Sequence, residues 1–211
     1  MSRTADHPAR RRQIQDGVRA VALAGGLGAV TVARTAAAAG VSVGLVQHYY
    51  ASKEELLSNT QRDMMHDVVA RVDAAIAREE RRHARIEHMM RAGLEELLPL
   101  DQRRREEVYL RRAFAGMALD HQALSEHQAR SDDLLRQRIV DGVLNATRCG
   151  ETRADVDAPF EAYALLALTD GLAAHLLSAT GASQRCWARA SLAARLADLF
   201  PGRCSRESST N

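Results

Sequence analysis

The stretch TVARTAAAAGVSVGLVQHYYASK, residues 31–53, decides the fold that we expect for this chain. Thr31 can cap a helix, because its hydroxyl accepts from the free N–H groups of the first turn, and the alanine-rich run 32–39 favours a helix. Gly40 suits the left-handed conformation that ends a helix, and Ser42 can cap a second short helix. The pattern therefore predicts two short helices joined by a tight turn, followed by the start of a third helix.

Two short helices with this spacing are typical of a helix-turn-helix, whose second helix enters the major groove of DNA. Ala36 is small enough for the two helices to cross closely, and Val41 and Val46 can fill the space between them. The same pattern would suit a structural corner between any two packed helices. The functional interpretation therefore needs support from the residues that follow the turn.

Those residues resemble the TetR-type repressor family. Gly40-Val41-Ser42 matches the turn of that family. His48-Tyr49-Tyr50 matches the aromatic residues that end its second helix, and Ser52-Lys53-Glu54 matches the start of its next helix. Gln47 stands where the family usually has tyrosine, and Ala51 where it usually has proline. The segment GLVQHY is most similar to the BetI-like branch, which includes choline-responsive repressors. The resemblance implies a ligand-responsive DNA-binding regulator, and it leaves the effector open.

Few side chains on so short a second helix can reach base edges, and we expect four residues to do so: Val43, Gly44, Leu45 and Gln47. Gln47 can form a bidentate pair with adenine, and Leu45 can pack on a thymine methyl group. The resemblance implies further DNA contacts, mainly to phosphates, from Thr31, Val32, Arg34, Ser42, His48, Tyr49 and Lys53. We expect the neighbouring Tyr50 to pack in the core.

The composition favours an all-α protein, because alanine, leucine, arginine and glutamate dominate while aromatic residues make up only 4% of the chain. Residues 1–62 hold eight lysine and arginine residues against four aspartate and glutamate, a net charge of +4, whereas the whole chain carries +2. The basic excess lies where phosphate binding would need it. Within it, Arg10-Arg11-Arg12 could reach DNA or could simply solvate a helix end.

Three cysteines without a CxxC pair, Cys149, Cys186 and Cys204, indicate free thiols in a cytosolic chain. No apolar stretch is expected to approach the roughly 20 residues of a membrane span, and the N-terminus lacks the apolar region of a signal peptide. We therefore expect a cytoplasmic protein, associated with the bacterial nucleoid when bound to DNA. We expect no membrane partner, no cofactor and no metal.

Hydrophobic periodicity predicts about nine helices in two domains. The first is a three-helix helix-turn-helix domain over 1–53, and the second is a ligand-binding and dimerisation bundle over 54–202. A disordered tail is expected over 203–211. A long fourth helix should run to about Arg82 and join the domains, so its tilt could transmit ligand binding to the DNA-binding domain.

Capping residues predict where several of these helices begin. Ser52 and Glu55 have the spacing of a capping box for the long fourth helix. Asp101, Asp157 and Ser183 are expected to cap later helices of the bundle.

The first of the last two helices is apolar over most of its circumference, and together with its partner it has more apolar surface than one small bundle can bury. In the resembled family these helices pair with their twofold mates, which implies a homodimer. Two DNA-binding domains about 34–36 Å apart could then read a pseudo-palindromic operator. The expected interface residues are Leu165, Leu168, Leu172, Leu176, Trp187, Leu192, Leu196 and Leu199. Burial within a single chain is the alternative for them.

Methionine and aromatic side chains of the middle helices could line an adaptable cavity for an effector. The candidates are Met89, Met90, Tyr109, Phe114 and Met117. The same residue types at helical spacing are also typical of an ordinary core, so both interpretations stay open.

An enzyme is the rival class. Glu80 and His83 have the Glu-x-x-His spacing of di-iron helical bundles, but such a site needs two of these pairs and two further carboxylates. The sequence offers one pair in an arginine-rich stretch, with no nucleophile elbow and no glycine-rich phosphate loop. We therefore expect no catalytic residue and no metal ligand. A purely structural helical interaction protein is a third class, and it would not need a basic N-terminal segment.

Overall fold

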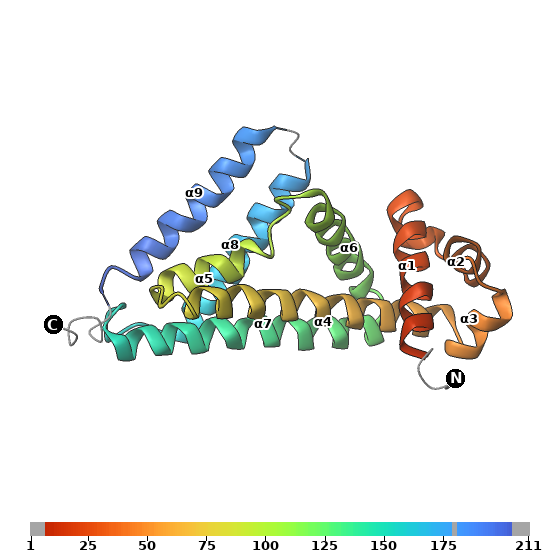
Figure 1. The fold of residues 1–211 in the computed structure, drawn as a ribbon, viewed down its shortest axis with the longest axis horizontal. Helices are drawn as coiled ribbons and strands as arrows, with labels where there is room; N and C mark the ends of the chain where they lie inside the picture. Colours follow the sequence, from red (N-terminus) through yellow and green to blue (C-terminus); the bar gives the residue numbers. More distant parts are fainter. Residues whose placement is uncertain (1–6, 179–180, 204–211) are drawn as a thin grey trace. The chain divides into compact units, whose positions relative to one another are not determined.

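The computed structural model describes residues 7–178 and 181–203, and within these ranges the chain has nine α-helices and no β-strand (Figure 1). The predicted all-α class is confirmed. The helices are α1 (His7–Gly25), α2 (Val32–Ala39), α3 (Val43–Tyr49), α4 (Lys53–Glu80), α5 (Ile86–Glu95), α6 (Gln102–Ala118), α7 (Gln122–Cys149), α8 (Ala158–Ser178) and α9 (Ala182–Leu199), with a 3₁₀ helix, η1 (Leu27–Ala29), before α2. Apart from Arg203, the predicted disordered tail lies outside the described residues, as does Cys204; Cys149 and Cys186 are free thiols.

The chain forms two compact units. The N-terminal unit contains the residues up to Met65 together with Tyr109–Ala129, and the C-terminal unit contains His66–Val108 and the residues from Arg130 onward. Helices α4, α6 and α7 therefore each contribute residues to both units. The domain boundary that the sequence suggests, after residue 53, stays a prediction.

In the N-terminal unit, α1 packs closely on α2. Ile14 and Val18 of α1 are at most 1% exposed. Between them Gly17 meets α2, where an added Cβ atom would lie 2.8 Å from the carbonyl oxygen of Thr35 and 2.9 Å from the Cβ of Ala39. The Gln13 amide donates to the carbonyl of Ala39 across 2.7 Å and so satisfies a backbone group at the end of α2. A side chain larger than hydrogen at position 17 would push the two helices apart.

Polar groups fasten α1 to α4 inside the same unit. Gln15, which is 5% exposed, donates its amide to a carboxylate oxygen of Asp63 across 2.6 Å. Tyr50 is 2% exposed, so the prediction that it packs in the core is confirmed. Burial raises the pKa of its phenol above the ordinary value, because the charged form would lose hydration.

In the C-terminal unit, Arg71 of α4 ties two other helical segments together. Its guanidinium pairs with Glu96 at 3.1 Å and with Glu107 at 2.7 Å, and all three side chains are less than a fifth exposed. Burial alone would lower the pKa of Arg71, but the hydrogen bonds and charges of the two glutamates outweigh it and raise that pKa. Arg105 of α6 donates to the carbonyl of Leu176 at 2.9 Å, at the end of α8.

A buried carboxylate starts α5. Glu151 is 1% exposed and accepts hydrogen bonds from the backbone N–H groups of Ile86, at 3.1 Å, and Glu87, at 3.4 Å. Arg85 lies 3.6 Å from the same carboxylate and donates to the carbonyl of Phe200 at 2.9 Å. These bonds hold the end of the described chain against the start of α5.

The predicted helix starts are confirmed with two differences. Asp101 accepts from the backbone N–H of Arg104 at 2.8 Å, and Asp157 from that of Phe160 at 3.0 Å. Ser52 accepts from the N–H of Glu55 at 3.1 Å, but the Glu55 carboxylate accepts from Ala51, one residue earlier than a capping box requires. The prediction that Ser183 caps α9 is wrong, because α9 begins at Ala182 after Gly181 and has no side-chain cap.

One helix within the described residues, α8, is long and apolar enough by length and composition to cross a membrane, so the expectation that no stretch approaches such a span is wrong. Core helices of soluble proteins pass the same test. Ala162, Leu165 and Thr169 are fully buried along one side of α8, as in a core helix. The length of α8 therefore argues only weakly for a membrane span.

Gly17→Ala should destabilise the protein. In a helix interior this change normally gains about 1 kcal/mol, but overpacking a tight contact costs about 1–3 kcal/mol, and here the contact includes backbone that cannot rotate away. We expect a net loss of about 1–2 kcal/mol in the free energy of unfolding, measured by urea denaturation at matched protein concentration. Gly28→Ala is the control, since its added Cβ would meet no atom within 4 Å. A gain in stability for Gly17→Ala would contradict this packing.

Candidate nucleic-acid interface

The turn between α2 and α3 has the predicted capping at each step. Thr31 accepts from the backbone N–H of Arg34 at 3.1 Å, and Ser42 accepts from that of Leu45 at 3.1 Å. Gly40 adopts the left-handed conformation, with φ of 64°, at the end of α2. These bonds satisfy the first-turn N–H groups of both helices and set the direction in which α3 leaves the turn.

The outer side of α3 is open to solvent. Val46 is 0% exposed and anchors the inner side of the helix. Gly44, Gln47 and His48 are exposed, and Val43 is 43% exposed. None of the eleven residues predicted to contact DNA is buried, and an added Cβ at Gly44 would meet no atom within 4 Å. The glycine therefore leaves free space on the outside of α3, where another backbone could approach closely.

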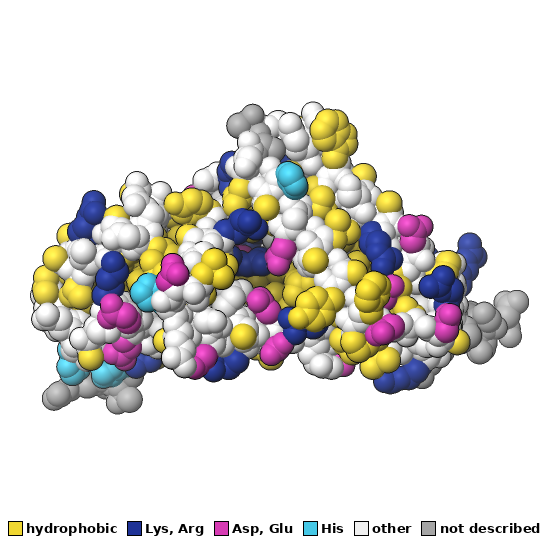
Figure 2. Space-filling model, turned by 180° about the vertical axis from the view of Figure 1, so that it is seen from behind, with side chains coloured by type: hydrophobic (Ala, Val, Ile, Leu, Met, Phe, Trp, Pro, Cys, Tyr) yellow, Lys and Arg dark blue, Asp and Glu magenta, His cyan; other side chains and the backbone are white. Residues whose placement is uncertain are grey.

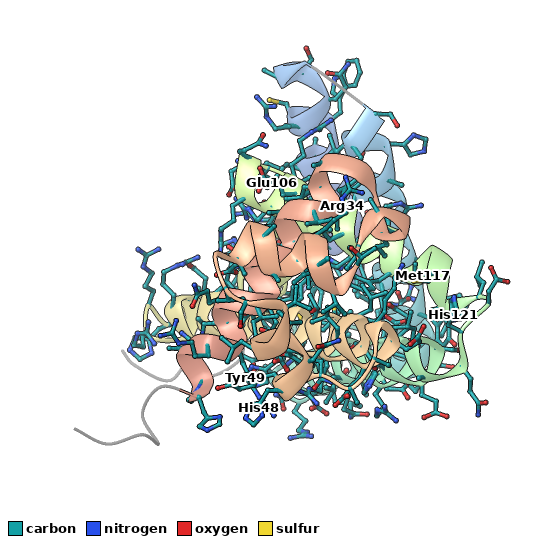
Figure 3. All side chains as sticks on the ribbon, turned by 90° about the vertical axis from the view of Figure 1, so that its right-hand side faces the viewer. Arg34, His48, Tyr49, Glu106, Met117 and His121 are labelled. Atoms are coloured by element: carbon teal, nitrogen blue, oxygen red, sulfur yellow. The ribbon has the colours of Figure 1, made fainter. Side chains whose placement is uncertain are left out.

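Figure 3 labels three of the predicted phosphate-binding side chains, Arg34, His48 and Tyr49. His48 and Tyr49 lie next to each other at the end of α3, with ring centroids 5.5 Å apart, and Arg34 projects from α2. Arg34 and Lys53 donate to backbone carbonyls of the η1 segment, at 3.2 Å from Ala29 and 3.5 Å from Gly28. Two cations thus lie beside the η1 segment, and a histidine lies at the end of α3.

Sequence reasoning missed one aromatic neighbour of this surface. The ring of His7, at the start of α1, lies 5.4 Å from that of Tyr49. No local pattern signals this contact, because it arises when α1 folds back toward α3. Of the arginine cluster, Arg11 and Arg12 are exposed, while Arg10 bonds Gln13 at 3.0 Å.

The apolar cavity of the C-terminal unit is small. Its volume is about 20 Å³, close to the space of one water molecule. It is lined by Val72, Ile76, Met90, Gly93, Leu94, Leu97, Leu135, Arg138 and Ile139. Arg138 is held by Asp73 at 2.7 Å, and that hydrogen bond lowers the pKa of the Asp73 carboxyl.

Of the five residues predicted to bind an effector, only Met90 lines this cavity. Met89 is half-buried in the same unit. Tyr109, Phe114 and Met117 belong to the N-terminal unit, where Phe114 is 1% exposed and Tyr109 is 40% exposed. The cavity therefore brings none of the other four together with Met90.

Most of the leucines predicted to form a dimer interface are buried within this one chain. Exposure is at most 6% for Leu165, Leu176, Leu192, Leu196 and Leu199; Leu168 and Leu172 are half-buried; and Trp187 is 67% exposed. Trp187 shares its exposure with apolar and small residues outside the predicted set: Phe160, Tyr163, Ala167 and Gly171 on α8, and Ala194 and Ala197 on α9, which with Trp187 form one set. We call this set the α8–α9 face. Figure 2 shows hydrophobic side chains spread over the surface among basic and acidic ones.

The possible di-iron pair does not have the geometry of a metal site. Helix α4 ends at Glu80, and His83 lies beyond it with a φ of 55°, so the two side chains do not share a helix face. Within the described residues no group of three histidine, cysteine, aspartate or glutamate side chains could hold a metal.

A capped corner of two short helices, with a second helix exposed along its outer side, is the structure of a helix-turn-helix, the DNA-binding element of a class of transcriptional regulators. The family model described as bacterial regulatory proteins of the tetR family matches residues 14–60, and that of the BetI-type transcriptional repressor C-terminal region matches residues 86–201. The chain belongs to the TetR family of transcriptional regulators, within its BetI-like branch. Family membership identifies a DNA-binding regulator and not an enzyme.

Individual proteins agree with this assignment. The regulator BetI of Cronobacter sakazakii is 30% identical over 176 residues, covering 82% of this chain and 81% of that protein. PksA of Bacillus subtilis is 25% identical over 181 residues, covering 84% and 83%. A transcriptional regulator from Rhodococcus sp. has the same fold, with a TM-score of 0.78 at 24% identity over 90% of this chain and 95% of that one. FadR of Bacillus subtilis, solved with stearoyl-CoA, gives 0.74 at 14% identity over 90% and 99%.

Proposed function

We propose that this protein is a homodimeric repressor that binds a pseudo-palindromic operator and leaves it when a small molecule binds. The observation that carries the proposal is the exposed outer side of α3, held by a buried Val46 and by two capped helix starts. A helix with this exposure fits a major groove, whose base edges present a distinct pattern for each base pair. The setting that we infer is the bacterial cytoplasm.

We expect two kinds of DNA contact, one to base edges and one to phosphates. Gln47 is exposed on α3 and can donate to and accept from one adenine, so it would read sequence. Lys53 lies in the first turn of α4, where its ammonium and free backbone N–H groups could hold one phosphate. Arg34, His48 and Tyr49 would add further phosphate contacts around the groove.

The homodimer would form through the α8–α9 face. Its alanines and glycine let two helices approach closely, while Phe160, Tyr163 and Trp187 are between 64% and 67% exposed and offer large apolar surface to bury. Arg136 lies over the ring of Tyr163, 4.4 Å from its centroid, and would hold that ring in place. The buried leucines beneath would then support the interface without entering it.

An effector that binds in the apolar cavity would have to open the C-terminal unit, because ligand sites are typically about 300–1,000 Å³ and this cavity holds about one water. Opening it would displace α4 relative to α5 and α7, which all line it. Helix α4 continues into the N-terminal unit, so a ligand that prefers the opened form would weaken DNA binding by its differential affinity. The lining has no aromatic residue and includes Arg138, which does not favour a cation such as choline.

Gln47→Ala and Lys53→Ala should weaken DNA binding in different ways. Gln47→Ala should relax the preference at one base position by about 1–3 kcal/mol, whereas Lys53→Ala should weaken all sequences alike and reduce the salt slope by about 1. Both are measured by titrating the DNA that flanks the gene of this protein, and single-base variants of it, at several salt concentrations. Unchanged affinity for Lys53→Ala would contradict the docking proposed here.

Trp187→Ala should shift the protein toward monomers. Removal of one large aromatic anchor from an interface costs about 2 kcal/mol, and a homodimer loses two, so we expect the dimer dissociation constant to rise on the order of 1,000-fold. Sedimentation equilibrium measures it, and Leu119→Ala is the control, since Leu119 is 87% exposed and belongs to the N-terminal unit, not to the α8–α9 face. An unchanged dissociation constant for Trp187→Ala would show that the proposed interface is wrong.

A further inference from the structure

A groove in the C-terminal unit has more arginines in its lining than any other residue type. It is a groove of about 670 Å³, formed by the end of α4, one face of α5, the start of α6 and one side of α9. Its cationic lining residues are Arg78, Arg82, Arg91, Arg104 and Arg189, joined by His88. Three glutamates also line it, so the arginines and glutamates together leave a net charge of +2. This groove lies entirely within one unit and is distinct from the small apolar cavity.

Each glutamate of the groove is already paired. Arg82 lies 3.3 Å from Glu79, Arg189 lies 2.6 Å from Glu95, and Arg104 lies 3.4 Å from Glu96. The side chains of these glutamates are less than a fifth exposed. Each guanidinium has five N–H donors, so the paired arginines keep donors that an incoming anion could use. The acidic side chains therefore position the arginines more than they oppose an incoming anion.

Arg91 differs from the other arginines. Within the part of the chain that the structure describes, its half-buried side chain has no ion-pair partner and no hydrogen-bond partner. A guanidinium that is partly removed from water and left unpaired gains most from an anion that enters the groove. His88 lies three residues earlier on the same face of α5 and adds further donors.

Two of the lining residues, Glu96 and Arg104, are each held by more than one ion pair. Glu96 is bound by Arg71 from one side, at 3.1 Å, and by Arg104 from the other, and Arg104 is further fixed by Asp101 at 2.7 Å. The backbone N–H of Arg104 and, after it, the Arg104 side chain donate to Asp101 and lower the pKa of that carboxyl. A fixed arrangement of this kind reduces the entropy that a ligand would otherwise lose on binding.

We propose that this groove binds a small molecule with two or more negative charges, carried by phosphate or carboxylate groups. The net charge of the lining matches such a ligand, guanidinium forks match the geometry of both groups, and a volume of about 670 Å³ is sufficient for a metabolite. A quaternary ammonium ligand does not fit, because the lining is cationic and contains no phenylalanine, tyrosine or tryptophan. The proposal does not depend on DNA binding.

Calorimetric titration of the purified full-length protein tests this inference in low-salt buffer without phosphate. Pyrophosphate and citrate are the probes for the two anionic groups, and choline chloride is the cationic comparison. We expect saturable binding of at least one anion, weakened by added salt, and no binding of choline in the groove. Arg91→Gln should weaken anion binding about tenfold, because it removes the unpaired charge.

Arg81→Gln is the matched control, since Arg81 is exposed on the neighbouring turn and does not line the groove. It removes the same charge and should leave anion affinity unchanged. Equal losses for the two variants would show nonspecific attraction and overturn the proposal, as would the absence of saturable binding by both anions. The unfolding midpoint of each variant checks that it is folded, and DNA retardation by the same samples reports separately on the proposed repressor function.

Discussion

The close crossing of α1 over α2 at Gly17 is the constraint on which DNA recognition depends. With only hydrogen at this position, α1 approaches the backbone of α2, and Gln13 can reach the carbonyl of Ala39. That packing holds α2 in place, and the left-handed Gly40 with the Ser42 cap then directs α3 outward. The exposed side of α3 is therefore a consequence of buried contacts several residues away, because few contacts of its own hold so short a helix.

Local chemistry made much of the fold predictable. Thr31, Ser42, Asp101 and Asp157 all cap helices as their sequence positions indicate, because a cap involves only the first turn that follows it. Contacts that form only in the folded chain could not be predicted in this way. Glu151 belongs to a polar loop in the sequence, yet it is buried against the start of α5, 65 residues away in the chain.

The same limit explains the outcome for the predicted dimer interface and the predicted effector pocket. Periodicity shows that α8 is apolar on most sides, but it does not show which sides the same chain covers; the structure covers leucines such as Leu165 and leaves Phe160 and Tyr163 exposed. Methionines and aromatics predicted to share a pocket are divided between two units, and only Met90 reaches the apolar cavity. The arginine-lined groove could not be predicted from the sequence, because its arginines and glutamates come from four helices that are far apart in the chain.

The central claim is that two copies of α3 read DNA from the major groove. Methylation protection of guanine N7 atoms in the DNA flanking the gene of this protein tests it most directly, because N7 lies in the major groove. The account predicts two protected groups related by a pseudo-twofold axis, with centres about 10–10.5 base pairs, or a multiple of that, apart. A single protected group, or no protection of N7 atoms in DNA that the protein binds, would contradict it.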